Sequence, residues 1–439
     1  MQELKNLMQN AGIVGAGGAG FPSYAKLAEG ADLLLINGSE CEPLLYTDYI
    51  ILKNELSMVL AGISEVLSHT GIPSAMIAIK AHTAKRLGMN DGERLASKIS
   101  VKVLPDVYPI GDEIGLIYES TGRLVKPGKL PITQGVIVYN VETMYDLGRA
   151  ARFNKCVTEK WLTVGGAVKN PTVIKAPIGT RVTDILRELN IELDEDCTVL
   201  DGGPSMGKII NPNTYAIGKT TKGILILPND TEAIRSKKMN VKMAIARAET
   251  ACCQCTRCTD MCPRHLLGYP LEPHKMVRTA MGAVEAMPDM VLSATLCCGC
   301  GICESLACSQ GISPRAVIAN YKELLAKNKL RFDLPGEYNV KSEREYRMIP
   351  SEKWMSTLGI TKFDKVADFG KEINSINRVE IPLTRHIGVP SVPVVNDGDF
   401  VNEGDLIACA GNGLSLPQHA SISGTVTLGN DKIIIDRIR

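Results

Sequence analysis

The sequence has almost no excess of charge of either sign. Its 49 Lys and Arg residues balance 48 Asp and Glu residues, which leaves a formal net charge of +1 at pH 7. Proteins bind nucleic acids and anionic membranes through basic patches or stripes, whereas the two signs are mixed throughout this chain. The sequence therefore predicts no nucleic-acid partner and no attraction to an anionic membrane surface.

Long apolar segments are also missing. No apolar run reaches the roughly 20 residues that a helix needs to cross a bilayer. The first residues do not follow the basic, then apolar, then cleavable order of a secretory signal. We therefore predict a soluble, cytoplasmic protein with no membrane span. At 439 residues, we expect about three or four domains.

Cysteine, by contrast, occurs in a pattern that carries chemistry. Eight of the 14 cysteines fall into two runs, each with three cysteines at Cys-x-x-Cys-x-x-Cys spacing and a fourth a few residues on. Three thiolates at this spacing can bind one face of a cubane cluster, and the fourth serves a neighbouring cluster, as in two-cluster bacterial ferredoxins. The sequence therefore predicts two [4Fe–4S] clusters bound by Cys252, Cys255, Cys258, Cys262, Cys297, Cys300, Cys303 and Cys308.

The pattern favours this interpretation over two others. A zinc site usually shows Cys-x-x-Cys pairs and closes on four ligands, and a disulfide framework is typical of short secreted chains. Ferredoxin-like ligation would be crossed, with Cys308 completing the first run and Cys262 the second. Ser309 stands where a Pro usually follows the fourth cysteine, so the crossed partition is a hypothesis. We expect Cys253 and Cys298, one residue out of register, to line the sites without ligating.

The first 150 residues are typical of an α/β domain. Strand-like runs at 33–37, 75–80 and 135–140 alternate with helical stretches at 54–69 and 92–100. We expect these elements to form the first domain.

The rest of the chain changes character several times. Residues 160–228 predict short strands and one helix capped by Thr183, with Ile185, Leu186 and Leu189 on its apolar side. Between the cysteine runs, helical segments are predicted to be broken by prolines 270, 273 and 288. Residues 315–368 predict a helix and a connecting segment. The alternation at 392–408 and 421–438 predicts a small β sandwich or barrel.

A glycine-rich loop, Gly15-Ala16-Gly17-Gly18-Ala19-Gly20-Phe21-Pro22, follows the first predicted helix. The usual dinucleotide fingerprint requires a strand before the glycines. Residues 3–12 look helical, so we do not expect a Rossmann loop. Glycines still let backbone amides approach a phosphate or a flat ring closely, and Lys26 follows within reach of a phosphate.

Polar residues also follow several predicted strands. The segments are Asn37-Gly38-Ser39-Glu40-Cys41-Glu42-Pro43, Tyr108-Pro109-Ile110-Gly111-Asp112-Glu113 and Asn140-Val141-Glu142-Thr143. Acidic groups at the carboxyl end of a strand are well placed to bind ribose or ribityl hydroxyls. One such segment alone is usually a helix cap or a turn. Together with the glycine loop, they predict a nucleotide or flavin site.

The segments GAGGAGFPSYAK, NGSECEP, YPIGDE and YNVET resemble those of the flavin- and NADH-binding subunit of respiratory complex I and of the related RnfC-type subunits. Ser39 stands where the complex I subunit often has Asp. The resemblance implies FMN as a non-covalent cofactor and NADH as a substrate. It places FMN against Gly15, Gly17, Gly18, Gly20, Lys26, Asn37, Glu40 and Asn140, and NADH against Phe21, Glu42 and Glu113, with Phe21 stacked on a base.

The resemblance extends over nearly the whole chain apart from about residues 315–370. Residues 164–207 resemble the soluble-ligand-binding β-grasp (SLBB) module, and residues 386–424 resemble the RnfC barrel-sandwich segment, here near the C-terminus. This order is most similar to that of the cobalamin reductases of bacterial propanediol utilisation. It implies a multidomain α/β protein with a flavin and NADH domain that is not a standard Rossmann fold (1–155), an SLBB β-grasp domain (160–230), a helical two-cluster domain (239–315), a connecting segment (316–370) and a barrel-sandwich domain (371–439).

The predicted parts imply a sequence of electron carriers. NADH gives two electrons as hydride and a [4Fe–4S] cluster takes one, so a flavin must stand between them. Hydride transfer needs no acid–base pair, and we predict none. The resemblance implies cobalamin as the acceptor, reduced from cob(III)alamin towards cob(I)alamin to support reactivation of a cobalamin-dependent diol dehydratase. A corrinoid adenosyltransferase and the shell proteins of a bacterial microcompartment are the further partners, and that compartment the location, that it implies.

Two other functions fit parts of the sequence. An RnfC-like subunit would deliver the electrons to a different partner or to a membrane complex. A non-catalytic electron-transfer module would have lost nucleotide binding, but the intact glycine loop, Lys26 and Glu113 argue against it. The string nearest to the Asp-x-His-x-x-Gly cobalamin motif, Pro263 to Gly268, begins with Pro. We therefore predict no stable corrin site.

Overall fold

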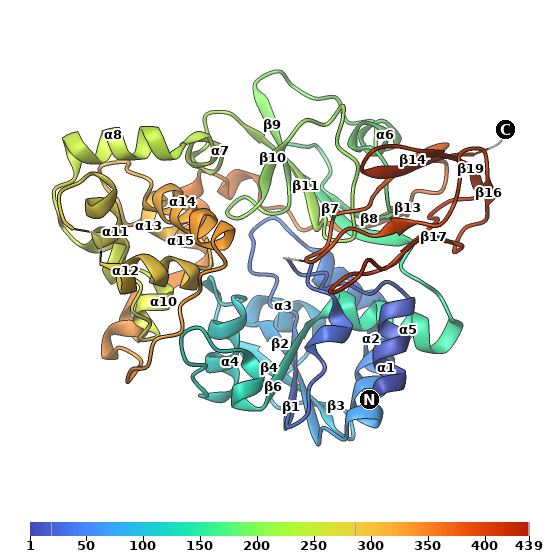
Figure 1. Ribbon diagram of the computed structural model, residues 1–439, viewed down its shortest axis with the longest axis horizontal. Coiled ribbons are helices and arrows are strands. Elements are labelled where there is room, and N and C mark those ends of the chain that lie inside the picture. The colour runs from blue at the N-terminus through green and yellow to red at the C-terminus, as the bar shows by residue number, and fades with distance from the viewer. Residues whose placement is uncertain (19, 286, 438–439) are drawn as a thin grey trace.

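Figure 1 shows a computed structural model of the chain, which describes residues 1–18, 20–285 and 287–437. Two predicted positions lie outside these ranges, Ala19 of the glycine loop and Ile438 of the last β segment. An α/β domain lies at the bottom of the view, a helical region at the left, a second sheet at the top and a small β domain at the right. Within the described ranges, no helix is both long and apolar enough to span a bilayer.

The N-terminal domain is built on a five-stranded sheet with the order β3-β4-β2-β1-β6. Neighbouring strands are parallel except β3 and β4. Strand β1 is buried on both faces, as expected for a parallel strand between helices. The strands are β1 (Leu33–Asn37), β2 (Ser74–Lys80), β3 (Arg94–Ala96), β4 (Ile99–Leu104) and β6 (Val136–Asn140).

Helices cover both faces of this sheet. Leu34 of β1 packs into one core with α2 and α5, while Leu35 packs into another with α4. Helices α2 and α5 approach so closely at Gly62 and Gly148 that a Cβ on either glycine would collide with the backbone of the other helix. The helices are α1 (Gln2–Asn10), α2 (Thr47–Thr70), α3 (Ala81–Leu87), α4 (Glu113–Thr121) and α5 (Val141–Phe153).

Two sequence predictions for this domain were wrong in detail. The segment 92–100 is not helical, because Ile99 and Val101 are buried on one side of β4 and the chain turns into it after Gly92, where φ is +74°. Helix α2 begins at Thr47, earlier than predicted, because its first amides are capped by the distant carboxylate of Glu40. The predicted strands β1, β2 and β6 and the first helix are confirmed.

The second sheet has six strands in the order β10-β9-β11-β7-β8-β13. Its last strand comes from beyond the cysteine runs, so the chain returns to this sheet after leaving it (Figure 1). The strands are β7 (Glu159–Gly166), β8 (Thr172–Pro177), β9 (Cys197–Asp201), β10 (Lys208–Ile210), β11 (Gly223–Pro228) and β13 (Asp368–Glu372).

One helix, α6 (Val182–Glu188), accompanies this sheet, but Thr183 does not cap it. The residue before the helix is Arg181, whose extended backbone bridges to Ala216, and the amide of Val182 donates to the Tyr215 carbonyl. A neighbouring strand-like segment thus satisfies the amide at this helix end, and no side-chain cap forms.

The helical region carries both cysteine runs. Prolines 273 and 288, predicted to break helices, instead stand at the first position of α11 and α12, where a missing amide hydrogen costs nothing. The helices are α7 (Glu232–Lys238), α8 (Val241–Ala251), α9 (Arg257–Asp260), α10 (Pro263–Leu266), α11 (Pro273–Ala280), α12 (Pro288–Leu292), α13 (Ile302–Ser305) and α14 (Pro314–Lys327).

The segment after α14 is more than the helix and connection predicted for residues 315–368. Strand β12 (Ile349–Pro350) pairs with β5 (Val107–Tyr108) of the first domain, and α15 (Ser351–Leu358) follows. Trp354 of α15 is fully buried and stacks on Tyr108, with ring centroids 4.6 Å apart. This segment therefore clamps the helical region to the first domain.

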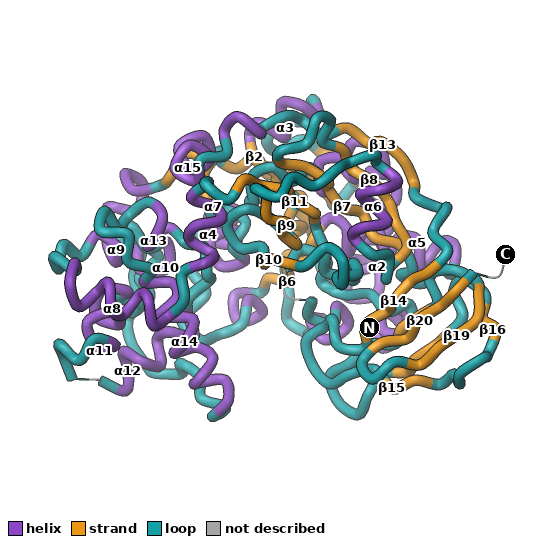
Figure 2. Tube along the Cα trace, turned by 90° about the horizontal axis from the view of Figure 1, so that it is seen from above, coloured by secondary structure: helices purple, strands orange, loops and turns teal. Residues whose placement is uncertain are grey.

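The C-terminal domain consists of two small antiparallel sheets, in the orders β14-β20-β19-β16 and β15-β17-β18. Their buried residues share one core with the second sheet, against which they pack (Figure 2). The predicted β sandwich is confirmed. Its strands are β14 (Arg378–Pro382), β15 (Val392–Pro393), β16 (Phe400–Val401), β17 (Leu406–Cys409), β18 (Gln418–His419), β19 (Gly424–Leu428) and β20 (Lys432–Asp436).

Candidate flavin and cluster sites

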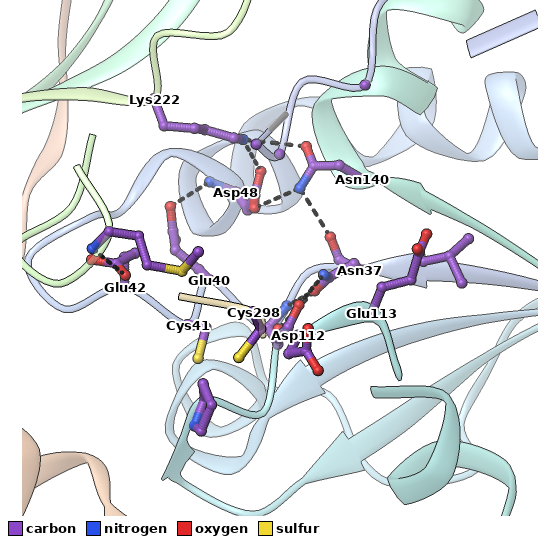
Figure 3. A pocket seen from close by; sticks show the side chains of 18 of the residues that line it. Asn37, Glu40, Cys41, Glu42, Asp48, Asp112, Glu113, Asn140, Lys222 and Cys298 are labelled. Carbon is purple, nitrogen blue, oxygen red and sulfur yellow. Dashed lines mark hydrogen bonds and ion pairs between the residues drawn. The ribbon is translucent and has the colours of Figure 1, made fainter. Parts of the chain in front are cut away.

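A cavity of about 400 Å³ lies at the carboxyl ends of β1 and β6. Its size is within the usual range for small-molecule sites, and we call it the flavin cavity. Figure 3 shows side chains from several segments directed towards it. The structure brings all the predicted cofactor-binding residues to its wall: Gly15, Gly17, Gly18, Gly20, Phe21, Lys26, Asn37, Glu40, Glu42, Glu113 and Asn140.

The parallel sheet explains why these segments meet. Asn37 and Asn140 are register partners at the ends of β1 and β6, and Asn140 Nδ2 donates to the Asn37 carbonyl at 3.1 Å. Asn37 Nδ2 donates in turn to the Gly111 carbonyl at 3.0 Å. The strand ends of an open parallel sheet form a crevice in which ligands commonly bind.

The glycine loop forms one side of the flavin cavity. Its ends are held together by a hydrogen bond from Gly15 N to the Phe21 carbonyl at 2.9 Å. A Cβ on Gly17 would lie 3.1 Å from the Asn140 side chain, while one on Gly18 would meet open space. The loop therefore offers a cradle without side chains, which fits the close approach of a phosphate or a flavin ring.

Lys26 and Glu113, predicted to face FMN and NADH respectively, form an ion pair of 2.8 Å in the flavin cavity. Lys26 Nζ also donates to the Val138 carbonyl at 3.1 Å. An ammonium group has three donors, so one remains for a phosphate. The pair holds the lysine in place and brings both predicted ligands to one wall.

Glu40 is buried at the start of α2. Its carboxylate accepts from the amides of Asp48 (2.9 Å) and Tyr49 (3.2 Å). Burial first, and then the nearby Asp48 carboxylate, raise the pKa of Glu40 to about 7. Its carboxyl group is therefore partly protonated near neutral pH and can donate a hydrogen bond as well as accept one.

The raised pKa of Glu40 predicts a pH effect on stability. The unfolded state loses this proton near pH 4.5 and the folded state near pH 7, so stability falls as the pH rises between these values. Glu40→Gln removes this loss, which is on the order of 3 kcal/mol above pH 7. The midpoint of thermal unfolding of Glu40→Gln should gain on that of the wild type from pH 5 to 8. The exposed control Glu323→Gln should follow the wild type at every pH, and parallel curves for Glu40→Gln would contradict the assignment.

Glu42 has a structural partner besides its predicted place beside NADH. Its buried carboxylate accepts from the amides of Ser205 (2.8 Å) and Met206 (3.1 Å), in the loop between β9 and β10. Burial raises its pKa. Glu42 therefore joins the flavin cavity to the second sheet.

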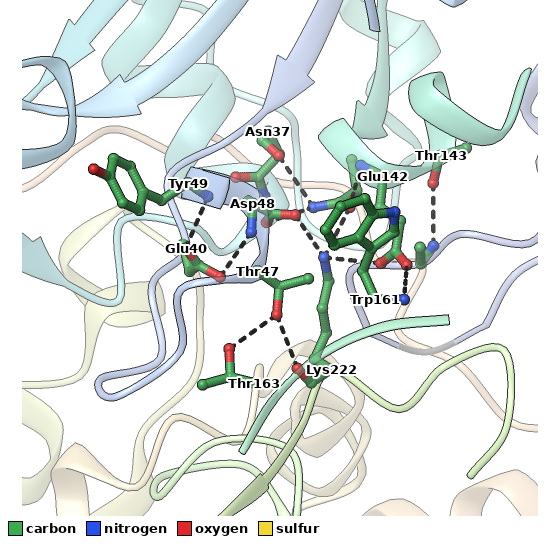
Figure 4. A network of polar contacts seen from close by, with 12 residues as sticks. Asn37, Glu40, Thr47, Asp48, Tyr49, Glu142, Thr143, Trp161, Thr163 and Lys222 are labelled. Atoms are coloured by element: carbon green, nitrogen blue, oxygen red, sulfur yellow. Dashed lines mark hydrogen bonds and ion pairs between the residues drawn. The ribbon is translucent and has the colours of Figure 1, made fainter. Parts of the chain in front are cut away.

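Sequence reasoning missed a buried charge network behind the flavin cavity (Figure 4). Lys222 Nζ lies 2.5 Å from Asp48 Oδ1 and 3.2 Å from both Glu142 Oε2 and Asn140 Oδ1. Glu142 also pairs with the buried Lys160. Although burial opposes its charge, Asp48 and Glu142 raise the pKa of Lys222 above its ordinary range. No local pattern marks Lys222, because its partners lie far away in the sequence.

Replacing Lys222 by Met should destabilise the first domain strongly. The change leaves the buried carboxylates of Asp48 and Glu142 without their shared cation, and breaking a buried pair from one side costs about 3–5 kcal/mol. Chemical denaturation followed by circular dichroism measures the effect. The matched control is Lys53→Met, which removes an exposed pair with Asp368 and should change little. Equal effects of the two variants would contradict the role of the network.

The cysteines of the two runs line two further cavities. Within the described ranges, which contain all 14 cysteines, every one is a free thiol. The outer thiol cavity is lined by Cys252, Cys255, Cys258 and Cys308, with Cys253 beside them, and the inner thiol cavity by Cys262, Cys297, Cys300 and Cys303, with Cys298 beside them. This is the grouping that crossed ligation predicts.

The chemistry of these thiols fits iron–sulfur clusters. Burial and repulsion by the neighbouring thiolates raise the pKa of Cys258 to about 12, and burial raises that of Cys262 to about 12. Such groups ionise together only around a positively charged centre. Gly299 N donates to Cys297 Sγ at 3.3 Å, as backbone amides do around cluster sulfurs. In the described part of the chain, no three His, Cys, Asp or Glu side chains gather closely enough for a single metal ion.

The flavin cavity and the inner thiol cavity share a wall. Cys298 and Cys300 line both. Tyr108, also on the flavin side, donates from its hydroxyl to the Cys300 carbonyl at 2.7 Å. At the far end, Cys253 and Cys255 of the outer thiol cavity are exposed. The three cavities therefore follow one another from the interior to the surface.

Comparisons with known proteins agree with this arrangement. The family model of the Nuo51 FMN-binding domain matches residues 8–149, that of the 4Fe-4S dicluster domain matches 251–313, and that of the RnfC barrel sandwich hybrid domain matches 369–432. The cobalamin reductase PduS of Salmonella typhimurium is 35% identical over 439 residues, covering 98% of this chain and 96% of the relative. The chain belongs to the PduS family.

Other relatives of this PduS family chain match all or part of it. PduS of Citrobacter freundii is 35% identical and covers 97% of this chain and 94% of its own length. The proton-translocating ferredoxin:NAD(+) oxidoreductase complex of Clostridium ljungdahlii contains an RnfC-like component that is 32% identical, over 61% of this chain and 57% of the relative. An NAD+-reducing [NiFe]-hydrogenase structure aligns at 20% identity with a TM-score of 0.45, over 76% of this chain and 63% of that one. The predicted oxidoreductase class, FMN-binding domain, two-cluster domain and barrel-sandwich domain are confirmed.

Proposed function

We propose that this PduS family protein is an NADH-dependent cobalamin reductase. The observation that carries the proposal is the wall that Cys298, Cys300 and Tyr108 form between the flavin cavity and the inner thiol cavity. When bound, FMN accepts an electron pair and releases single electrons, and each [4Fe–4S] cluster carries one. The residues of the wall keep the two sites adjacent and exclude water between them.

We assign the residues of the flavin cavity as follows. The amides of the glycine loop and the free donor of Lys26 bind the FMN phosphate. Asn37, Glu40 and Asn140 bind the ribityl chain and the ring edge, with Glu40 able to donate or accept because its pKa is about 7. Phe21, Glu42 and Glu113 face NADH. Because hydride transfer needs no general acid or base, these residues bind and orient the two partners.

The finer domain assignment also belongs to this proposal. We assign the second sheet to an SLBB β-grasp domain (160–230) beside the flavin domain (1–155), the two-cluster domain (239–315) and the barrel-sandwich domain (371–439). Pairing of β12 with β5, stacking of Trp354 on Tyr108 and addition of β13 to the second sheet give the intervening segment (316–370) a bracing role.

The acceptor follows from the family. The two PduS relatives that match nearly the full chain are cobalamin reductases. In this chain the cobalamin would meet the exposed end of the outer thiol cavity, free or on a corrinoid adenosyltransferase, within the cytoplasm or a bacterial microcompartment with its shell proteins. Pro263, where a cobalamin motif would have Asp, begins helix α10. A transient encounter with corrin is therefore more consistent with the sequence than a stable site.

An anaerobic assay of acceptors tests this function. The purified protein with its cofactors is mixed with NADH and either hydroxocobalamin or an oxidised ferredoxin. We expect NADH oxidation to depend on hydroxocobalamin, with cob(II)alamin formed. Turnover with ferredoxin alone would favour the RnfC-like alternative, to which relatives covering 61% of the chain correspond. Failure to bind FMN or to oxidise NADH with any acceptor would contradict both.

A further inference from the structure

A buried ion pair crosses the wall between the flavin cavity and the inner thiol cavity. Arg264 Nη2 donates to Asp112 Oδ1 at 2.6 Å. Asp112 lines the flavin cavity, whereas Arg264 lines the inner thiol cavity. The side chains are only 15% and 12% exposed. The pair is therefore the one charged link between these cavities among the ion pairs of the described residues.

Arg264 also has unused hydrogen-bonding capacity. Its Nε is buried and has no hydrogen-bond partner within the described part of the chain. A buried donor left unpaired costs about 1–3 kcal/mol, so such a group usually has a partner that completes it. Arg264 lies two residues after Cys262, at the start of α10, on the wall of the cavity that holds the four inner thiols. A cluster sulfide or thiolate sulfur is the acceptor available there.

The guanidinium keeps its positive charge in this place. Burial opposes the charge, but Asp112 and then Cys298 raise the pKa of Arg264 above its ordinary range. Asp112 and Cys298 lie on the same side of the flavin cavity (Figure 3). A reduced cluster carries one more negative charge than an oxidised one, so a fixed cation beside it favours the reduced form.

We propose that Arg264 tunes the inner cluster and that Asp112 sets the strength of this effect from the flavin side. Arg264 raises the cluster potential through its charge and a hydrogen bond from Nε, and Asp112 offsets part of that charge. Arg264 is thus a positioning and tuning residue, and Asp112 makes the cluster sensitive to the charge of the flavin cavity. The inference rests on the cluster domain and is independent of which molecule accepts the electrons.

Opposite shifts in two variants separate tuning from a structural role. Arg264→Gln removes the cation and should lower the inner-cluster potential, whereas Asp112→Asn removes the anion and should raise it. We expect about a tenfold change in the ratio of oxidised to reduced cluster in each direction, which is ~59 mV for one electron. Arg264→Lys keeps the charge and should stay closer to the wild type. The measurement is a potentiometric titration of the holoprotein, monitored by electron paramagnetic resonance.

A matched control is available in the neighbouring pair of Arg344 and Glu119. Their side chains are 13% and 15% exposed, nearly the same as Arg264 and Asp112, but neither residue lines the flavin cavity or the inner thiol cavity. Arg344→Gln should therefore leave both cluster potentials unchanged. Iron, sulfide and FMN contents confirm that each variant holds its cofactors.

Several results would overturn the proposal. Shifts of the same sign in Arg264→Gln and Asp112→Asn would show that only the loss of the pair matters. A shift in Arg344→Gln as large as that in Arg264→Gln would show a general effect of buried pairs. Loss of the inner cluster in both Arg264→Gln and Arg264→Lys would make Arg264 a structural anchor. If only Arg264→Gln loses its cluster, an absent upward shift in Asp112→Asn would be the contradicting result.

Discussion

Cys262→Ala is expected to empty the inner thiol cavity, and Cys308→Ala the outer one. Each of these cysteines lies in the cavity of the other run, so each variant should lose the cluster that the distant run begins. Each protein should retain about half of the wild-type iron and sulfide. Chemical analysis and electron paramagnetic resonance of the reduced proteins measure the outcome.

The two variants should also differ in function. Loss of the inner cluster interrupts the path next to the flavin cavity, while loss of the outer cluster interrupts it near the surface, and NADH should reduce the flavin in both. Matched controls are Cys253→Ala and Cys298→Ala, which replace lining cysteines and should keep both clusters. Loss of the cluster of its own run in Cys262→Ala would show that ligation is not crossed.

Gly17→Val is expected to abolish FMN binding. A Cβ at this position would lie 3.1 Å from the Asn140 side chain, and the two γ-methyl groups of Val would extend further towards it. Asn140 is itself held by the Asn37 carbonyl, Asp48 and Lys222, so it has no room to retreat. We expect FMN affinity to fall by at least a hundredfold, on the order of 3 kcal/mol.

Fluorescence titration of the flavin-free protein measures this loss. The matched control is Gly115→Ala, because an added Cβ there meets only the Asp112 carboxylate at an ordinary 3.8 Å. This variant should bind FMN as the wild type does. Normal FMN affinity in Gly17→Val would place the cofactor away from the glycine loop and contradict the assignment of the flavin cavity.

The predicted site could be assembled from the sequence because it follows from strand ends. Asn37 and Asn140 each come directly after an apolar run, and adjacent parallel strands bring their carboxyl ends together. The cysteine runs were equally accessible, because the spacing itself describes the ligand set. Local patterns of this kind need no knowledge of the rest of the fold.

The features that sequence reasoning missed all depend on distant partners. Lys222 is an ordinary lysine until the second sheet brings it to Asp48 and Glu142. The bracing by Trp354 depends on a ring of the first domain, and the Arg264–Asp112 pair joins residues from two domains. The helix predicted at 92–100 failed for a similar reason, since pairing with β2 decides the conformation of β4.

The most direct test of the account follows a single turnover without oxygen. The holoprotein is reduced with one equivalent of NADH and mixed in a stopped-flow instrument with hydroxocobalamin, while flavin and corrin spectra are recorded together. We predict that cob(II)alamin forms as the flavin is reoxidised, and that Cys308→Ala keeps flavin reduction but loses this transfer. A flavin that stays reduced beside unchanged cob(III)alamin in the wild type, or equally fast transfer in Cys308→Ala, would contradict the account.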